Sequence, residues 1–333
     1  MYTAAVVGVK PPFGRVANLM KLTDQIKVVA VCDLKKEWAD ECAAKFAIPK
    51  AFGDFRDMLK EPFDIFVSFT GTYSRPEQVI AAAQAGRQIY TEKPLTLSIE
   101  EGRKMLDAVR QAKVKYQIGY QLRTYYFARA MKALIDKGVL GTIGTCMSRR
   151  FMPAEHWKGP GGKPTWYGRQ ELSGGITVDY TTHDIDLLRW WLGDIKTVYA
   201  NIRRSRCQTS DDNVWANLQF GNGAMGMIGA SFSATFGSCD IMVAGDKGSA
   251  RVVDYRDVMV KLWGVEEKPA SAYVDVTPDP EDVTRVQFEN LAAALRDNRE
   301  PSPNIEDGFR AVEVAVAMQR SSQTGKPVEL PLG

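Results

Sequence analysis

Two residues with acid–base chemistry, Asp179 and His183, lie four positions apart in the run SGGITVDYTTHDIDLLRWWLG. Residues at this spacing share one face of a helix, so both side chains would reach the same ligand if one helix includes them. A histidine held by a carboxylate suits general acid–base catalysis, because imidazole gains and loses a proton near neutral pH. A purely structural His–Asp pair at a helix start has the same spacing.

The residues after His183 predict an amphipathic helix near Thr181–Leu192. Its apolar residues recur at the i, i+3, i+7 spacing of a buried stripe: Ile185, Leu188 and Leu192. We interpret Asp184 and Asp186, in the same stretch, as a solvated or capping pair rather than as catalytic acids.

A lysine, Lys93, ends a predicted strand in the run YTEKPLT. Pro94 biases the preceding residue toward an extended backbone, which would hold the ammonium group beyond the strand end. In a parallel sheet, ligands bind at the carboxyl ends of the strands. On these grounds Lys93 fits a ligand site and a plain surface position equally well.

The first strand leads into a turn that partly matches a dinucleotide-binding motif. Such a motif has the pattern G-x-G-x-x-G, and this chain has GVKPPFG. Gly8 and Gly14 are present, but Lys10 replaces the second glycine, and the last glycine comes one position late. Pro11 and Pro12 remove two backbone donors, whereas Lys10 would add positive charge near a phosphate.

The second strand, VVAVCD, ends in Asp33, where a carboxylate would accept hydrogen bonds from the adenosine ribose. A carboxylate there also repels a 2′-phosphate and so favours NAD over NADP. Lys35 and Lys36 would weaken that preference, and a solvated loop acid is the alternative interpretation of Asp33.

The stretch from Pro153 to Gly175 is rich in Gly, Pro, Trp and charged residues. Its aromatic rings would stack on the apolar face of a sugar, and nearby cationic side chains would bind the hydroxyl groups. A packed or subunit-facing loop fits the same composition. The candidate substrate-binding residues are Arg123, Arg149, Arg150, His156, Trp157, Trp166 and Tyr167.

The elements that would position these residues fall into two domains. Residues 1–121 alternate β-rich runs with helical runs, which predicts a doubly wound α/β domain with a parallel sheet. Residues 122–333 contain several closely spaced strands and two closing helices near 283–298 and 305–324. Strands this close together cannot be parallel neighbours, so we expect an α+β domain with a large, mostly antiparallel open sheet.

Composition narrows the function classes. The 333 residues are 45% hydrophobic and 25% charged, and the net charge is only +3, without a basic block. We therefore expect neither a nucleic-acid nor a membrane partner. The five cysteines are scattered, without a CxxC pair or a metal-ligand cluster, and no signal segment precedes the first strand. Free thiols, no metal and a cytoplasmic location are the expectation.

Taken together, VVAVCD, AGRQIYTEKP, IGYQLR and the GG…D…HD.D pattern resemble the Gfo/Idh/MocA family of oxidoreductases. The resemblance covers essentially the whole chain, including EDGFRAVEVAVAMQRSSQTGKPVEL. It implies a Rossmann domain and an α/β domain whose open sheet forms homo-oligomer contacts, in a dimer or tetramer. It also implies catalytic roles for Lys93, Asp179 and His183.

The same resemblance assigns residues to the cofactor. The run SFTGTYSR resembles the family's cofactor-lining strand end, with Arg75 where a histidine is often found. The implied cofactor is NAD, or less favourably NADP. The cofactor-binding candidates are Gly8, Lys10, Gly14, Asp33, Thr70, Gly71, Thr72, Glu92 and Lys93.

The implied activity is hydride transfer between a nicotinamide and a hydroxyl or carbonyl of a sugar, sugar derivative or cyclitol. His183, oriented by Asp179, would take the hydroxyl proton while Lys93 stabilises the alkoxide; the roles of Lys93 and His183 are interchangeable at this stage. Three alternatives remain open: a reductase of a ketose, keto-sugar or anhydro-sugar, an NAD-retaining glycoside-cleaving or eliminating enzyme, and a non-catalytic sugar-binding member.

Overall fold

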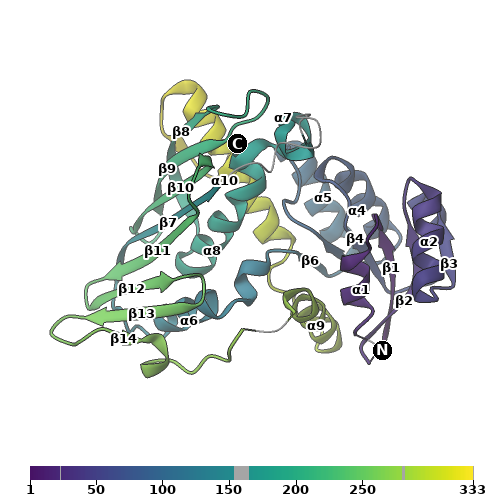
Figure 1. The fold of residues 1–333 in the computed structure, drawn as a ribbon, viewed down its shortest axis with the longest axis horizontal. Helices are drawn as coiled ribbons and strands as arrows, with labels where there is room; N and C mark the ends of the chain where they lie inside the picture. The colour runs from purple at the N-terminus through teal and green to yellow at the C-terminus, as the bar shows by residue number, and fades with distance from the viewer. Residues whose placement is uncertain (23, 154–164, 280–281, 333) are drawn as a thin grey trace. The chain divides into compact units, whose positions relative to one another are not determined.

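The computed structural model describes residues 1–22, 24–153, 165–279 and 282–332. The chain divides into two compact units, which are described separately (Figure 1). The first unit comprises Met1–Gln121 and Pro280–Phe309, and the second comprises Leu122–Asp279 and Arg310–Gly333.

The first unit contains a six-stranded parallel sheet in the order β3-β2-β1-β4-β5-β6. Its strands are β1 (Tyr2–Val7), β2 (Ile26–Cys32), β3 (Lys50–Phe52), β4 (Ile65–Ser68), β5 (Gln88–Thr91) and β6 (Tyr116–Ile118). The connecting helices are α1 (Gly14–Leu19), α2 (Lys36–Phe46), α3 (Phe55–Met58), α4 (Arg75–Gln84) and α5 (Ile99–Ala112). The predicted doubly wound fold is confirmed. Because the strand order reverses between β1 and β4, the carboxyl ends of these strands border a ligand-binding crevice.

One helix packs in the first unit against expectation. The sequence predicts one second domain for residues 122–333, but α9 (Val283–Arg296) belongs to the first unit. The ring of Phe288 lies 4.3 Å from that of Tyr90, centroid to centroid, and 6.4 Å from that of Phe69. Leu291 and Ala292 join the same core cluster. The packing of α9 is therefore set by burial of its apolar side chains against residues nearly 200 positions earlier in the chain, and not by its place in the sequence.

The second unit contains a nine-stranded sheet in the order β14-β13-β12-β11-β7-β10-β9-β8-β15. Its strands are β7 (Ile143–Pro153), β8 (Ile195–Arg203), β9 (Asn213–Phe220), β10 (Met225–Ala234), β11 (Ser238–Gly245), β12 (Gly248–Val253), β13 (Asp257–Leu262), β14 (Lys268–Pro269) and β15 (Val328–Glu329). Within the described residues, β7 and β10 form the parallel pair of this sheet and its other pairs are antiparallel. The expected mostly antiparallel sheet is confirmed.

Helices cover one face of this sheet (Figure 1). They are α6 (Tyr126–Asp136), α8 (Thr182–Leu192) and, from Arg310 on, α10 (Ile305–Thr324), with the short α7 (Gln170–Ser173) preceding α8. Along β9 the side chains alternate, with Val214 and Ala216 buried and Trp215 exposed, as the two-residue period of a strand requires. The face of the sheet opposite the helices therefore carries the alternate residues of each strand, such as Trp215.

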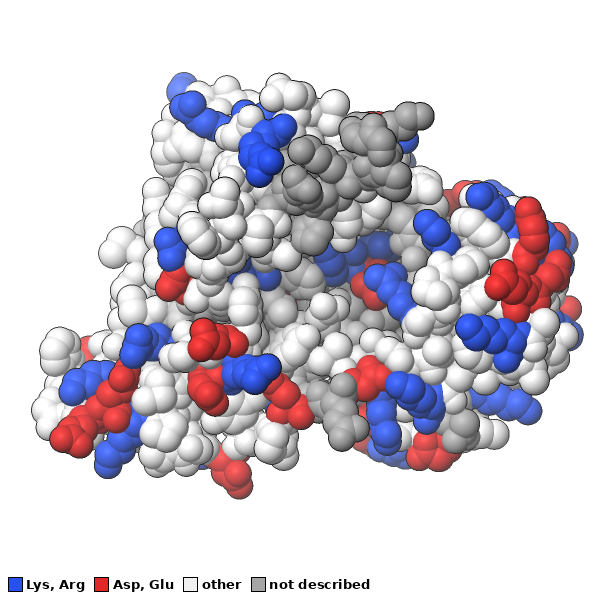
Figure 2. Space-filling view, in the orientation of Figure 1, with Lys and Arg blue, Asp and Glu red and all other residues white. Residues whose placement is uncertain are grey.

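Among the described helices, none combines the length and apolar character needed to span a bilayer. On the face seen in Figure 2, Lys and Arg are interspersed with Asp and Glu rather than gathered into one large basic area. That distribution does not resemble the electrostatic footprint of a nucleic-acid-binding surface.

Candidate active site

A cavity of about 510 Å³ opens at the carboxyl ends of β1, β2 and β4 in the first unit. Five predicted cofactor residues line it: Gly8, Lys10, Asp33, Thr70 and Gly71. The remaining candidates, Gly14, Thr72, Glu92 and Lys93, lie outside this lining. The wall also includes Cys32, and burial, followed by the nearby charge of Asp33, raises the pKa of its thiol to about 12. This thiol is therefore a neutral part of the cavity wall.

Gly8 leaves room in the cavity for the pyrophosphate of a dinucleotide. Its φ of 87° lies in the left-handed region, and a Cβ there would come within 3.0 Å of the Phe69 carbonyl carbon and the Thr70 nitrogen. A side chain would fill the cradle in which a pyrophosphate approaches the main chain. The cavity thus fits a dinucleotide at this position. Gly14 differs, because a Cβ there would meet nothing within 4 Å, so it lacks the close-packing role of the motif's last glycine.

Asp33 lies at the end of β2 amid positive charge. Its carboxylate accepts the backbone N–H of Lys35 at 3.0 Å. The ammonium groups of Lys35 and Lys10 lie 4.2 Å and 5.9 Å from the ring centre of Trp38, a cavity residue that the sequence patterns did not single out. Lys36 instead pairs with Asp40 on the surface. One carboxylate and two lysines therefore line the part of the cavity where ribose recognition is expected.

We expect Asp33→Ser to weaken NAD binding and to shift the ratio of NADP to NAD dissociation constants at least about tenfold toward NADP. The substitution removes the repulsion of a 2′-phosphate while Lys10 and Lys35 remain. Lys10→Ala is expected to move the ratio in the opposite direction. Calorimetric titration of both cofactors measures the ratio, and an unchanged ratio in Asp33→Ser would contradict this role for Asp33.

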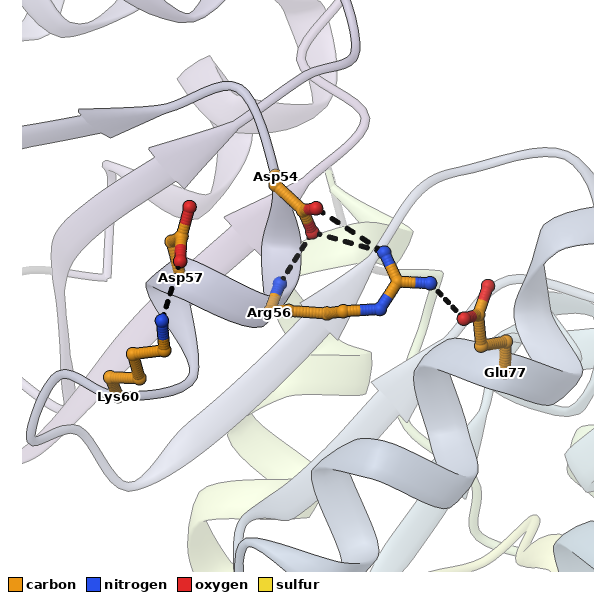
Figure 3. A network of polar contacts seen from close by, with 5 residues as sticks. All are labelled: Asp54, Arg56, Asp57, Lys60 and Glu77. Atoms are coloured by element: carbon orange, nitrogen blue, oxygen red, sulfur yellow. Dashed lines mark hydrogen bonds and ion pairs between the residues drawn. The ribbon is translucent and has the colours of Figure 1, made fainter.

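Figure 3 shows a network of ion pairs, three of whose residues line the cavity. The Arg56 guanidinium donates to Glu77 at the start of α4 and to Asp54, at 3.3 Å, before α3. Asp54 also caps α3 by accepting the Arg56 backbone N–H at 2.8 Å. These three residues all line the cavity. Because their side chains are exposed, they contribute more to the shape of the cavity wall than to stability.

Lys93 lies between β5 and α5, and the peptide bond to Pro94 is cis. The neighbouring peptide is held by Arg75, the residue that departs from the family pattern. The buried guanidinium of Arg75 donates to the carbonyl of Pro94 and, at 2.9 Å, to the carbonyl of Thr70. Arg75 therefore ties the Lys93–Pro94 segment to the cavity-lining segment after β4.

We expect Arg75→Met to lower the free energy of unfolding by about 1–3 kcal/mol for each buried carbonyl that loses its donor. Arg75→Lys should recover part of the loss, because an ammonium group still donates to one of them. Chemical denaturation followed by circular dichroism measures the change. Equal stability of Arg75→Met and the unmodified chain would show that these two hydrogen bonds are dispensable.

Asp179 and His183 are both buried in the second unit, with 3% and 7% of their surfaces exposed. They do not share one α-helix, however. Asp179 lies in a π-helical turn, Ile176–Tyr180, whereas His183 is the second residue of α8. The i, i+4 rule for an α-helix therefore does not describe this pair, since the wider turn intervenes. The stripe predicted from Ile185, Leu188 and Leu192 is buried as expected.

Asp184 and Asp186 are not a solvated or capping pair; that interpretation is wrong. Asp184 accepts two hydrogen bonds from Arg150 of β7, at 2.7 and 2.5 Å, and Asp186 accepts two from Arg123, at 2.8 and 2.6 Å. All four side chains are nearly inaccessible to solvent. Side chains two positions apart on an α-helix point roughly 200° apart around its axis. The two aspartates therefore connect opposite sides of α8 to different segments.

These ion pairs involve arginines that the sequence analysis predicted to bind the substrate. Arg123 and Arg150 are buried ion-pair partners of α8, and a substrate contact of either residue stays a prediction. Arg149 pairs with Asp240 on β11. Its side chain lies on the face of β7 opposite to Arg150, and therefore away from α8. A substrate contact of Arg149 likewise stays a prediction.

The remaining substrate candidates come from the segment before α8. Trp166 and Tyr167 lie in a short 3₁₀ helix, Trp166–Gly168, with ring centres 4.3 Å apart. Trp166 is partly exposed, so its ring is available to a ligand. His156 and Trp157 lie outside the described residues. Within the described residues, no group of three or more His, Cys, Asp or Glu side chains could hold a metal ion.

Two family models match the chain in order. Residues 3–120 match the NAD-binding Rossmann fold of the oxidoreductase family, and residues 132–330 match its C-terminal alpha/beta domain. The chain belongs to the Gfo/Idh/MocA oxidoreductase family. The predicted family, the oxidoreductase class and the NAD cofactor are confirmed by these matches.

Relatives of this Gfo/Idh/MocA member have related activities. It is 28% identical to scyllo-inositol 2-dehydrogenase (NAD(+)) of Bacillus subtilis, over 94% of this chain and 91% of the relative. It is 27% identical to 1,5-anhydro-D-fructose reductase of Ensifer adhaerens, over 92% of each chain. A levoglucosan dehydrogenase solved with NADH and L-sorbose has the same fold, with a TM-score of 0.87 at 20% identity, covering 100% of this chain and 99% of the other.

Proposed function

We propose that this oxidoreductase transfers a hydride between NAD and a hydroxyl or carbonyl carbon of a sugar, sugar derivative or cyclitol. The cavity at the switch point between β1 and β4 carries the proposal, because it combines the Gly8 cradle with the Asp33 carboxylate. The relatives that act on inositol and on an anhydro-sugar support the substrate class. Bound NAD would supply the hydride acceptor for oxidation, and NADH the donor for reduction.

We assign acid–base work to the second unit. In the oxidation direction, the substrate C–H bond gives its electron pair and hydrogen to the nicotinamide, and His183 takes the proton of the hydroxyl group. Asp179 orients and stabilises the imidazolium that forms. Burial of both side chains supports this assignment, because charges interact more strongly in a dry environment than in water.

We assign stabilisation of the substrate oxygen to Lys93 of the first unit. Its ammonium group donates a hydrogen bond to the oxygen on which negative charge develops. The tie from Arg75 to Pro94 supports the assignment, since a fixed backbone limits where the lysine stem begins. Trp166 and Tyr167 are proposed to contact the sugar, since their rings lie next to one another before α8.

The purified chain should bind NAD and change NADH absorbance with at least one member of a panel of sugars, keto-sugars, anhydro-sugars and inositols. Product formation without net NADH would instead assign the chain to transient oxidation by retained NAD. Binding of a sugar without binding of NAD or NADP would overturn the oxidoreductase proposal in favour of a non-catalytic sugar-binding protein.

We also propose that the chain is a cytoplasmic homo-oligomer. All five cysteines are free thiols, which supports a reducing compartment. The sheet face opposite the helices supports self-association. Methionines from three adjacent strands are neighbours there, Met227, Met147 and Met242, and Trp215 is 41% exposed nearby. Such an apolar face is typical of a subunit contact.

We expect Met147→Glu to lower the oligomeric state, because the new carboxylate would be desolvated at the centre of the proposed contact. Size-exclusion chromatography with light scattering measures the mass of the assembly. Gln111→Glu adds the same charge to an exposed position of α5 and serves as the control. An unchanged assembly in Met147→Glu would rule out this face as the contact.

A further inference from the structure

The turn that carries Asp179 is held by a residue from a distant segment, Asp211, just before β9. The Asp211 carboxylate accepts the backbone N–H of Thr177 at 3.0 Å and also the Thr177 hydroxyl. Its main-chain carbonyl accepts the N–H of Ile176 at 3.1 Å. Asp211 is 6% exposed. One buried residue thus binds the first two residues of the π-helical turn.

The glycine pair before this turn makes room for Asp211. Gly175 has a φ of 71°, in the left-handed region, and a Cβ there would collide with the Asp211 carboxylate. Gly174 has a different role, since it ends α7 in the left-handed conformation. The GG pattern therefore serves two purposes: its first member terminates a helix, and its second admits the carboxylate that fixes the next turn.

Hydrogen bonds connect this turn to the start of α8, where His183 lies. The backbone N–H of Thr181 donates to the Ile176 carbonyl at 3.1 Å, and the Thr181 hydroxyl donates to the Thr177 carbonyl. The Thr182 hydroxyl donates to the Val178 carbonyl at 2.8 Å. Two of these three acceptors, Ile176 and Thr177, are the residues that Asp211 holds, and Asp179 and His183 lie within this bonded stretch.

We propose that Asp211 is a positioning residue that sets the placement of Asp179 and His183. The inference rests on the proposed function only for its effect on turnover. Placement of the acid–base pair matters for rate because a misplacement of about 1 Å can cost about 100-fold. Binding of NAD in the proposed cavity should not depend on Asp211, since the described residues that line this cavity all belong to the first unit.

The neighbouring Asp212 provides a matched control. Its carboxylate is also buried, but it accepts the backbone N–H groups of Ser205, Arg206 and Cys207 at 2.7–2.8 Å. It therefore organises the loop after β8 rather than the turn before α8. Asp212→Ala removes more side-chain hydrogen bonds than Asp211→Ala does, without touching Ile176 or Thr177.

Asp211→Ala is expected to lower kcat about 100-fold with an unchanged dissociation constant for NAD. Asp212→Ala should destabilise the protein but keep kcat. Asp211→Asn and Thr177→Val should give smaller losses in kcat and provide folded variants if Asp211→Ala does not fold. If Asp211 is a positioning residue, a conservative variant should recover turnover and the placement of His183 together.

A second measurement does not need turnover. The chain has two histidines, so a histidine-selective NMR spectrum assigns His183 by its loss in His183→Gln. The His183 signal should shift in the Asp211 variants and keep its position in Asp212→Ala. An unshifted signal with wild-type kcat in folded Asp211→Asn and Thr177→Val would overturn the inference. Full turnover in His183→Gln would instead overturn the proposed catalytic role and leave the NMR test of Asp211 intact.

Discussion

Replacing His183 by glutamine is expected to lower kcat about 10³-fold, because the hydroxyl proton then lacks its base at the moment of hydride transfer. Glutamine keeps a polar side chain of similar length, so the loss would report chemistry more than folding. Lys93→Met should cause a loss of similar size by removing the hydrogen bond to the developing alkoxide. Steady-state kinetics with the best substrate from the panel measures both.

The pH dependence distinguishes the two roles. If His183 is the base, the fall in kcat/KM on the acid side should disappear in His183→Gln and persist in Lys93→Met. The opposite pattern would exchange the roles of the two residues. Lys104→Met, at an exposed position of α5, is the control for Lys93 and should keep full activity. Near-normal turnover in both His183→Gln and Lys93→Met would show that the site assignment is wrong.

Asp184→Asn is expected to lower the free energy of unfolding by about 3–5 kcal/mol, because it leaves the Arg150 guanidinium buried without its counter-charge. The carboxylate also accepts the Ser148 hydroxyl at 2.5 Å, so its loss affects two residues of β7 at once. The large effect comes from burial and not from the number of ion pairs. Urea denaturation followed by circular dichroism measures it.

The next arginine on the same strand supplies the control. Arg149 pairs with Asp240, but both side chains are partly exposed, at 35% and 45%. Asp240→Asn should therefore cost less than about 1 kcal/mol. The double substitution Arg150→Met, Asp184→Leu should cost less than Asp184→Asn alone, since no charge is left buried. Similar losses in the free energy of unfolding for Asp184→Asn and Asp240→Asn would show that burial does not set the size of the effect.

Much of the first unit follows from local patterns. The alternation of β-rich and helical runs predicted the parallel sheet, and the position of Asp33 after VVAVCD placed it at a strand end, where it lines the cavity; its contact with the cofactor stays a prediction. These inferences succeed because strand periodicity and crossover handedness are properties of short segments. The sequence patterns do not single out Trp38, because no motif marks an aromatic residue of α2 as part of the cavity.

The assignments that needed correction all depend on distant contacts. The charges of Asp184 and Asp186 suggested exposure, but Arg150 and Arg123 compensate them from other segments. The sequence analysis did not single out Asp211, whose link to Thr177 spans 34 residues. A local pattern cannot predict such pairs, because a buried charge is tolerated only where its partner arrives through the fold.

The sequence by itself determined the element order, the family and the residue types available for acid–base and hydride chemistry. The tertiary structure decided that α9 joins the first unit, that two arginines pair with the acids of α8, and that Asp211 holds the turn containing Asp179. The physical reason is the range of the interactions. Backbone propensity acts over a few residues, whereas burial and ion pairing act between whichever residues the fold brings together.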